Sequence, residues 1–97
     1  MTRLLWRPMA MADREAIMDY IAQDNPGAAA DLDAEFEAKA ENARQRPMLY
    51  RAGRMRGTRE IVVRPNYVMV YRIEDEDDAV LMLRVLHAAQ QWPPARS

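Results

Sequence analysis

Three apolar runs in the second half of the chain constrain its fold more than any other feature. They span Gly57–Arg64, Tyr67–Ile73 and Ala79–His87 and are rich in β-branched and aromatic residues. Pro65-Asn66 separates the first two runs, and the charged stretch 74–78 separates the last two. Runs of this length between such turns predict an antiparallel three-stranded meander. Because the second and third runs are apolar at consecutive positions, we expect both faces of these strands to be largely covered.

The first half of the chain carries the 3.6-residue period of two amphipathic helices. One helix is predicted from Met9 to Gln23 and a second from Pro26 to about Arg44. Asn25 suits the N-cap of the second helix, and Pro26 suits its first position because the N–H there has no helical partner. The residues expected to be buried are spaced by three and four: Ala29, Leu32, Phe36, Ala40 and Ala43. The short connection makes the two helices an antiparallel hairpin.

Together these segments predict an α+β fold with the order β-α-α-β-β-β and a short C-terminal tail. Leu4–Trp6 is expected to add a brief edge strand to the meander, and the helical hairpin to cover one face of an antiparallel sheet. Residues 1–97 are enough for one such domain and too few for two. Residues 44–56 are expected to form a loop with a short strand or turn near 48–50, and Ala88–Trp92 one helical turn.

The turns also predict a strand register. The expected opposing pairs are Val63 with Val68, Arg59 with Arg72, Ile73 with Ala79, and Val68 with Arg84. In this register Arg59, Arg72 and Arg84 share one face of the sheet, and a slip of one residue would scatter them. For Arg72 and Arg84 the alternative is a structural role, in which each pairs with a carboxylate or a carbonyl at a strand end.

Composition excludes several classes of site. Cysteine is absent, His87 is the one histidine and Ser97 the one serine, so neither a zinc site of the usual kind nor a Ser-His-Asp triad is expected. The three glycines are scattered, which excludes a glycine-rich phosphate loop. We therefore expect no metal, no cofactor and no conventional catalytic constellation. His87 has two interpretations, a strand cap or a general base or contact residue.

No segment has the features of a membrane or export signal. No apolar run approaches the roughly 20 residues that a membrane-spanning helix needs, and residues 1–7 lack the apolar core of a secretion signal. The absence of cysteine is consistent with a reducing compartment, so a cytoplasmic location is expected.

Charge is distributed unevenly along the chain, although the formal net charge is only −1. Residues 1–43 hold four basic and nine acidic side chains, residues 44–72 hold eight arginines and one glutamate, and residues 73–97 hold two arginines and five acids. Two interpretations are open. The arginines pair with the acidic helices as a solvated face, or the basic middle is a docking surface for nucleic acid or for an acidic partner segment.

Five segments in order carry a resemblance to a known family: Asp19-Tyr20-Ile21, Asn25-Pro26 with Ala28-Ala29, Gly57–Val63, Tyr67–Ile73 and Leu83–Pro93. In this order and at this length they resemble the RelE/ParE superfamily of type II toxin–antitoxin toxins. The resemblance implies a helical hairpin on an antiparallel sheet and a cognate antitoxin, ParD-like or RelB-like. It also implies one of two activities, since RelE-type members are ribosome-dependent mRNA endonucleases and ParE-type members poison DNA gyrase.

Alignment on Val70-Tyr71-Arg72 favours the ParE-like branch. Where RelE-like nucleases carry two lysines the chain has about Glu60 and Val62, and where they carry two arginines it has about Val68 and Ala88. Loss of one stabilising donor costs on the order of 10²–10³ in rate, so loss of most of them is expected to abolish that mechanism. The slightly acidic chain agrees, because a ribosome-binding nuclease is expected to be basic.

Three hypotheses follow for function. The first is a ParE-like toxin without catalytic residues that inhibits DNA gyrase by protein–protein contact. Its target- or antitoxin-binding residues would be Arg54, Arg56, Arg59, Arg64, Arg84, His87 and Trp92. The alternative is a RelE-like endonuclease on ribosome-bound mRNA with a rearranged site, formed by Arg59, Arg72, Arg84 and His87. A third is an inactive relative that only binds its antitoxin. In each case an acidic-to-amphipathic antitoxin segment is expected to wrap the sheet and the helical hairpin.

Overall fold

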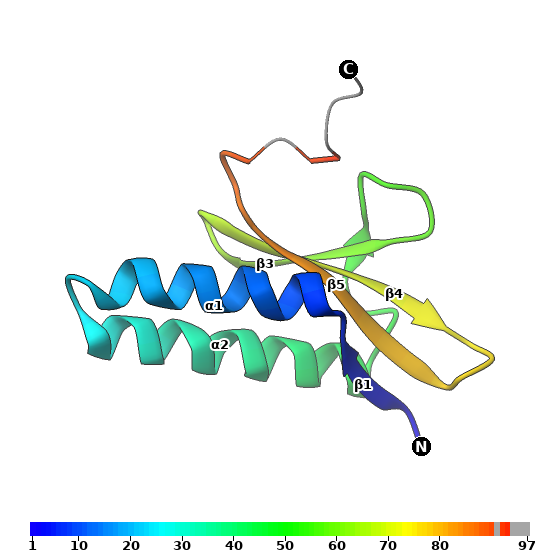
Figure 1. The fold of residues 1–97 in the computed structure, drawn as a ribbon. Coiled ribbons are helices and arrows are strands. Elements are labelled where there is room, and N and C mark those ends of the chain that lie inside the picture. The colour runs from blue at the N-terminus through cyan, green and yellow to red at the C-terminus, as the bar shows by residue number, and fades with distance from the viewer. Residues whose placement is uncertain (91, 94–97) are drawn as a thin grey trace.

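Two helices lie side by side on one face of a five-stranded sheet (Figure 1). The computed structural model describes residues 1–90 and 92–93. The elements, in chain order, are β1 (Arg3–Trp6), α1 (Pro8–Ala22), α2 (Pro26–Gln45), β2 (Arg51–Ala52), β3 (Arg59–Arg64), β4 (Tyr67–Glu74) and β5 (Ala79–His87). The predicted order β-α-α-β-β-β is confirmed, with β2 as one additional short strand. Within the described residues neither helix is long and apolar enough to cross a bilayer.

The sheet is mixed, in the order β1-β5-β4-β3-β2. Strands β2 to β5 are antiparallel to their neighbours, as the turns predict, while β1 runs parallel to β5. Leu4–Trp6 therefore does supply an edge strand, and the expectation of a purely antiparallel sheet was wrong at this strand. The helical hairpin separates β1 from the meander, so β1 is not constrained to the antiparallel direction that a tight turn imposes.

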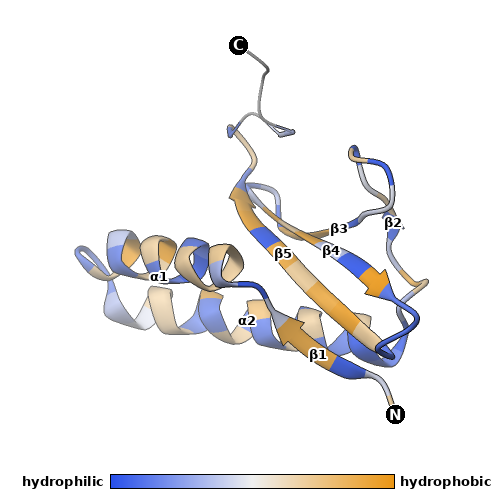
Figure 2. Ribbon diagram, turned by 45° about the vertical axis from the view of Figure 1, so that its right-hand side comes forward, coloured by the Kyte–Doolittle hydropathy of each residue, from blue (hydrophilic) through white to orange (hydrophobic). Residues whose placement is uncertain are grey.

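The helices begin and end within one residue of the predicted positions. Asn25 caps α2 as expected, because its Oδ1 accepts a hydrogen bond from the Ala28 N–H at 3.0 Å. The predicted stripe of α2 is buried throughout, with Leu32 and Phe36 fully enclosed. It packs on the sheet face that carries Ile61, Met69, Tyr71 and other members of the main hydrophobic cluster. Figure 2 shows the apolar bands of β1 and β5 that take part in this layer.

The predicted register was wrong at both hairpins of the meander. The turn at Pro65-Asn66 forms as expected and sets Arg64 opposite Tyr67, but a β-bulge at Val63 then places Val62 opposite Val68. Strand β4 continues one residue further than predicted, so Glu74 faces Ala79, and a second irregularity leaves Leu83 unpaired. The actual partners of the residues in the predicted pairs are Arg59 with Tyr71, Arg72 with Leu81, Ile73 with Val80, Val68 with Leu86, and Val70 with Arg84.

This register distributes the sheet arginines over both faces. Arg59 lies opposite Tyr71, and Arg72 is the next residue of β4, so Arg59 and Arg72 point to opposite sides. The expectation that Arg59, Arg72 and Arg84 share one face was therefore wrong. An extra residue in a strand moves all later side chains to the other face, and neither bulge has a glycine that would mark it in the sequence.

The second sheet face has no helix over it but is largely buried in its centre. Val68, Val70 and Leu86 are each less than a tenth exposed although they lie outside the main cluster. After β5 the chain makes one hydrogen-bonded turn, in which the Gln90 N–H donates to the His87 carbonyl at 2.8 Å. The predicted helical turn at Ala88–Trp92 includes Gln91, which lies outside the described residues.

Candidate protein-interaction surface

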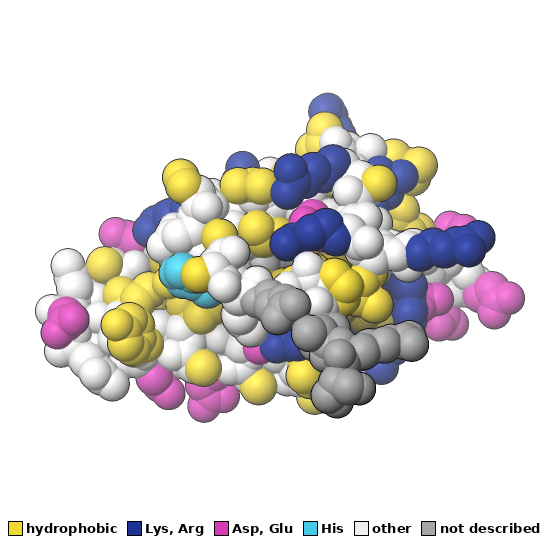
Figure 3. Space-filling model, turned by 90° about the horizontal axis from the view of Figure 1, so that it is seen from above, with side chains coloured by type: hydrophobic (Ala, Val, Ile, Leu, Met, Phe, Trp, Pro, Cys, Tyr) yellow, Lys and Arg dark blue, Asp and Glu magenta, His cyan; other side chains and the backbone are white. Residues whose placement is uncertain are grey.

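A hollow of about 530 Å³ opens on the helix-free face of the sheet. It is lined by Arg51, Ala52, Gly53, Arg54, Glu60, Val62, Pro65, Val68 and Ala88. Strands β3 and β4 supply an apolar floor, and β2 with the loop after it supplies one basic wall. Figure 3 views the molecule from above and shows several Lys or Arg side chains gathered on this side.

Glu60 places a buried carboxylate in this hollow. Its side chain is 1% exposed, and its Oε2 accepts hydrogen bonds from the Arg54 backbone N–H at 2.8 Å and from Arg54 Nε at 3.2 Å. Arg51 Nη2 lies 3.5 Å from Oε1, which is buried and has no hydrogen-bond donor among the described residues. Burial raises the pKa of Glu60, but the Arg54 hydrogen bonds and the charges of Arg54 and Arg51 outweigh it and lower the pKa below its ordinary value. Glu60 is therefore ionised at neutral pH.

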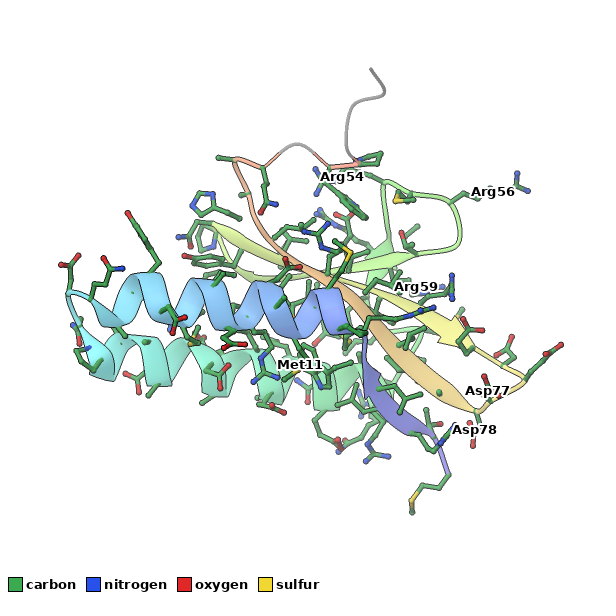
Figure 4. The ribbon with its side chains drawn as sticks, viewed as in Figure 1. Met11, Arg54, Arg56, Arg59, Asp77 and Asp78 are labelled. Carbon is green, nitrogen blue, oxygen red and sulfur yellow. The ribbon has the colours of Figure 1, made fainter. Side chains whose placement is uncertain are left out.

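The loop between β2 and β3 presents the basic residues of the wall. The Gly53 N–H donates to the Thr58 carbonyl at 2.7 Å, and the Thr58 hydroxyl donates to the Met55 carbonyl at 2.6 Å. Gly57 has a φ of +80°, a conformation that glycine adopts without steric cost. In this tight loop Arg54 turns inward to Glu60, while Arg56 is exposed and points away from the body of the molecule (Figure 4).

The four residues expected to act in a nuclease do not converge. Each of the four side chains contacts different neighbours.
Arg59 donates to the Tyr50 carbonyl at 2.6 Å on the helix side, and Arg72 pairs with Glu74 at 2.6 Å. Arg84 forms two hydrogen bonds with Asp13 of α1, at 2.8 and 3.0 Å. These bonds raise the pKa of the Arg84 guanidinium. His87 packs its ring edge-on to Tyr67 at 5.4 Å, and its Nδ1 accepts a hydrogen bond from the Ala89 N–H at 3.1 Å.

Some of the expected binding residues lie at the hollow, and the others lie elsewhere on the molecule. Arg54 and Arg56 belong to the basic wall and its loop. Arg64 is engaged with Glu35 of α2. The guanidinium of Arg84 lies 5.8 Å from the centre of the Trp92 ring, so Arg84 and Trp92 are neighbours at the end of β5. The structural interpretation of Arg72 and Arg84 agrees with their carboxylate partners.

Sequence reasoning did not single out Glu60 and Arg51 as a pair. Glu60 opens an apolar run, Ile61 to Val63, and an acid in such a strand needs a cationic partner if it is buried. That pattern gave a signal for Glu60. Arg51 had none, because its position depends on the two residues of β2 and their pairing with Glu60 and Arg59.

A second surface feature is apolar and lies at the start of α1. Leu5, Met9 and Met11 are large hydrophobic residues that are each more than a third exposed. Arg7, Pro8, Met9 and Leu83 line a depression of about 330 Å³ beside them. Figure 4 shows Met11 on α1. Exposed apolar groups gathered in this way are typical of a protein contact surface.

Two helices packed on a five-stranded mixed sheet are the fold of RelE/ParE-type proteins. Residues 4–92 match the family model described as the ParE toxin of the type II toxin–antitoxin system parDE. The chain therefore belongs to the ParE toxin family, within the RelE/ParE superfamily that its sequence resembles.

Individual relatives agree with this assignment. The chain is 36% identical to the protein Y4kP of Sinorhizobium fredii over 92 residues, which cover 94% of this chain and 93% of Y4kP. It is 35% identical to the toxin RelE2 of Caulobacter vibrioides, with 93% and 99% covered. Its fold is similar to a chain of the chromosomal ParDE system of P. aeruginosa, with a TM-score of 0.76, 20% identity, and 90% and 96% of the two chains covered.

Proposed function

We propose that this toxin inhibits DNA gyrase through protein–protein contact and cleaves no RNA. The ParE-type activity implied by the family resemblance is the starting point. The observation that carries the proposal is the dispersal of Arg59, Arg72, Arg84 and His87, each of which is engaged by its own neighbours. A nuclease that uses no metal needs several such groups around one phosphate.

The electrostatics of the hollow also support a protein contact. Arg51 and Arg54 are the cations that line it, and Glu60 lies against both. A ribonuclease site must stabilise negative charge that develops on the phosphate. A buried carboxylate that already occupies the guanidiniums opposes this role, whereas the apolar surface of Val62 and Val68 is suited to a protein side chain.

Two activities measured in parallel test the proposal. Purified toxin is expected to inhibit gyrase-catalysed supercoiling of relaxed plasmid in a concentration-dependent manner. The same preparation is expected to leave mRNA intact on translating ribosomes. Cleavage of ribosome-bound mRNA without any effect on supercoiling would replace this proposal with the RelE-type activity, and no effect in either assay would favour an inactive relative that only binds its antitoxin.

A cognate antitoxin, ParD-like or RelB-like, is part of the proposal. The apolar surface formed by Leu5, Met9, Met11 and Leu83 fits an amphipathic part of the antitoxin segment, and the arginines of the loop after β2, at the opposite edge of the sheet, fit an acidic part of it. Such a segment would order on binding. Addition of the antitoxin to the supercoiling assay is expected to restore gyrase activity.

The alternative is a RelE-like endonuclease, and two observations favour it. The relative from C. vibrioides, 35% identical, is named RelE2. In addition, the hollow has a basic wall on the open sheet face. The ribosome assay above decides between these functions.

A further inference from the structure

The position of Glu60 in the hollow is not required by packing alone. Neighbouring positions of β3 and β4 on this sheet face carry valine, at Val62, Val68 and Val70. A carboxylate at a buried position is costly unless it is paired. Glu60 is hydrogen-bonded through one oxygen only, since Oε2 accepts two hydrogen bonds from Arg54, while the buried Oε1 accepts none from the described residues and lies 3.5 Å from Arg51 Nη2.

The carboxylate acts on both cations of the wall. Arg54 donates through its backbone and its guanidinium, and Arg51 lies within ion-pair distance of the other oxygen. The two arginine side chains are still partly exposed, by 63% for Arg51 and 49% for Arg54. They could therefore contact an incoming ligand. The negative charge of Glu60 lies beside them, however, and acts strongly in a site of reduced dielectric.

We propose that Glu60 is a specificity residue that excludes phosphodiester ligands from the hollow. A phosphate that approaches Arg51 and Arg54 is repelled by the carboxylate, which also neutralises part of the positive charge of both guanidiniums. An uncharged protein side chain on Val62 and Val68 meets neither obstacle. The inference rests on the proposed function and deepens it, because it assigns to one residue the choice of protein over nucleic acid.

Substitution of Glu60 by Gln tests this directly. Glutamine keeps the size of the side chain and an oxygen that can accept from the Arg54 N–H, but it removes the charge. With a short fluorescently labelled single-stranded RNA as the probe, Glu60→Gln is expected to bind about tenfold more tightly than the unmodified toxin at low salt. Its log affinity is expected to fall more steeply with log salt, by roughly 0.7 for each guanidinium that gains a phosphate.

Glu41→Gln is the matched control. Glu41 pairs with Arg44 on α2, in the helical layer rather than in the hollow. The substitution changes the net charge by the same amount and also releases one arginine, so it is expected to change RNA affinity by about twofold or less. An equal gain in the two variants would overturn the inference, because net charge alone would then explain it.

Arg51→Ala provides a second measurement that does not depend on how well Glu60→Gln folds. In the unmodified toxin it is expected to leave RNA binding within about twofold, since Glu60 prevents Arg51 from taking a phosphate. Combined with Glu60→Gln it is expected to remove much of the gain. A large loss of RNA binding on Arg51→Ala in the presence of Glu60 would contradict the inference.

Thermal melting of each variant establishes that it is folded, and the supercoiling assay on the unmodified toxin is scored separately. If the toxin inhibits gyrase but Glu60→Gln gains no RNA binding, the inference fails and the proposed function remains. If Glu60→Gln gains RNA binding in the hollow but the toxin does not inhibit gyrase, the proposed function fails.

Discussion

At the scale of single residues, the Asp13 carboxylate supplies a hydrogen-bond acceptor to strand β5 where no neighbouring strand does so. Strand β1 pairs with β5 only as far as Met82, and Arg7 then donates its N–H to the Met82 carbonyl at 2.9 Å. Beyond that point β5 has no neighbouring strand on this side. Asp13 of α1 takes that place, because its Oδ2 accepts from the Val85 N–H at 2.9 Å while the carboxylate also holds Arg84. Asp13 therefore satisfies a backbone donor and a guanidinium together.

Asp13→Ala is expected to lower the free energy of unfolding by about 2–4 kcal/mol, because it leaves a partly buried guanidinium and a backbone N–H without partners. Both side chains are less than a fifth exposed, which limits solvent screening. Urea unfolding followed by circular dichroism measures the change. Asp19→Ala, on the exposed side of the same helix, is expected to stay within about 0.5 kcal/mol of the unmodified protein. Similar losses in both variants would argue that Asp13 acts only through general charge.

At the scale of secondary-structure elements, the connection from α2 to β2 is held by bonds to the sheet. The Tyr71 hydroxyl donates to the Pro47 carbonyl at 2.6 Å, and Arg59 donates to the Tyr50 carbonyl at 2.6 Å. Tyr71 is fully buried, and its burial raises the pKa of its hydroxyl, so this group remains a donor at neutral pH. These bonds fix where β2 begins and thus where Arg51 enters the hollow.

Tyr71→Phe is expected to reduce stability by about 1–2 kcal/mol through the loss of this part-buried hydrogen bond, since no other donor to the Pro47 carbonyl lies among the described residues. The midpoint of urea unfolding measures the effect. Tyr20→Phe serves as the comparison, because Tyr20 is 75% exposed and its hydroxyl can bond to water. An unchanged midpoint for Tyr71→Phe would mean that the connection is held by packing.

The elements that the sequence predicts well are those with local causes. The two helices follow from apolar spacing and from the Asn25-Pro26 start signal, and the meander follows from Pro65-Asn66 and the acidic turn. The pairing of strands was harder to predict. The bulge at Val63 and the unpaired Leu83 lie inside apolar runs without a glycine, so neither has a sequence signal of its own.

The candidate site depends on those same long-range details. The arginines 59, 72 and 84 were placed on one face by a register that the bulges change. The pair of Glu60 with Arg51 arises from β2, whose two residues have no distinctive pattern. Arg54 and Arg56 were predicted as contact residues on charge alone, and that remains a prediction although their loop is now defined.

At the scale of the whole molecule, the basic middle of the sequence does not form one continuous surface. Arg44, Arg64 and Arg72 are each engaged by a carboxylate, at Glu41, Glu35 and Glu74. The interpretation of paired arginines is therefore confirmed for Arg44 and Arg64, whose partners lie on α2, while a docking role for other arginines stays a prediction. Arg56 is exposed on the loop that borders the hollow, and its contact with a protein target stays a prediction.

Arg56→Glu is expected to weaken gyrase inhibition by about tenfold if the loop contacts an acidic region of the target, with little change in stability. The concentration of toxin that halves the supercoiling rate measures this. Arg46→Glu makes the same change in charge at the exposed end of α2, away from the hollow, and is expected to have an effect of about twofold or less. Equal effects at the two positions would show that the loop is not the contact.

The parallel pairing of β1 with β5 joins two segments that are far apart in the sequence and are therefore synthesised at different times. Thr2 and Asp78, 76 positions apart, are in hydrogen-bond contact beside this pair. Contacts of such long separation form late in folding, because the intervening loop must close first. While the chain emerges from the ribosome, α1 and α2 are synthesised before strands β3 to β5, on which the two helices pack. A growing chain of this toxin thus carries an incomplete sheet until synthesis has passed β5.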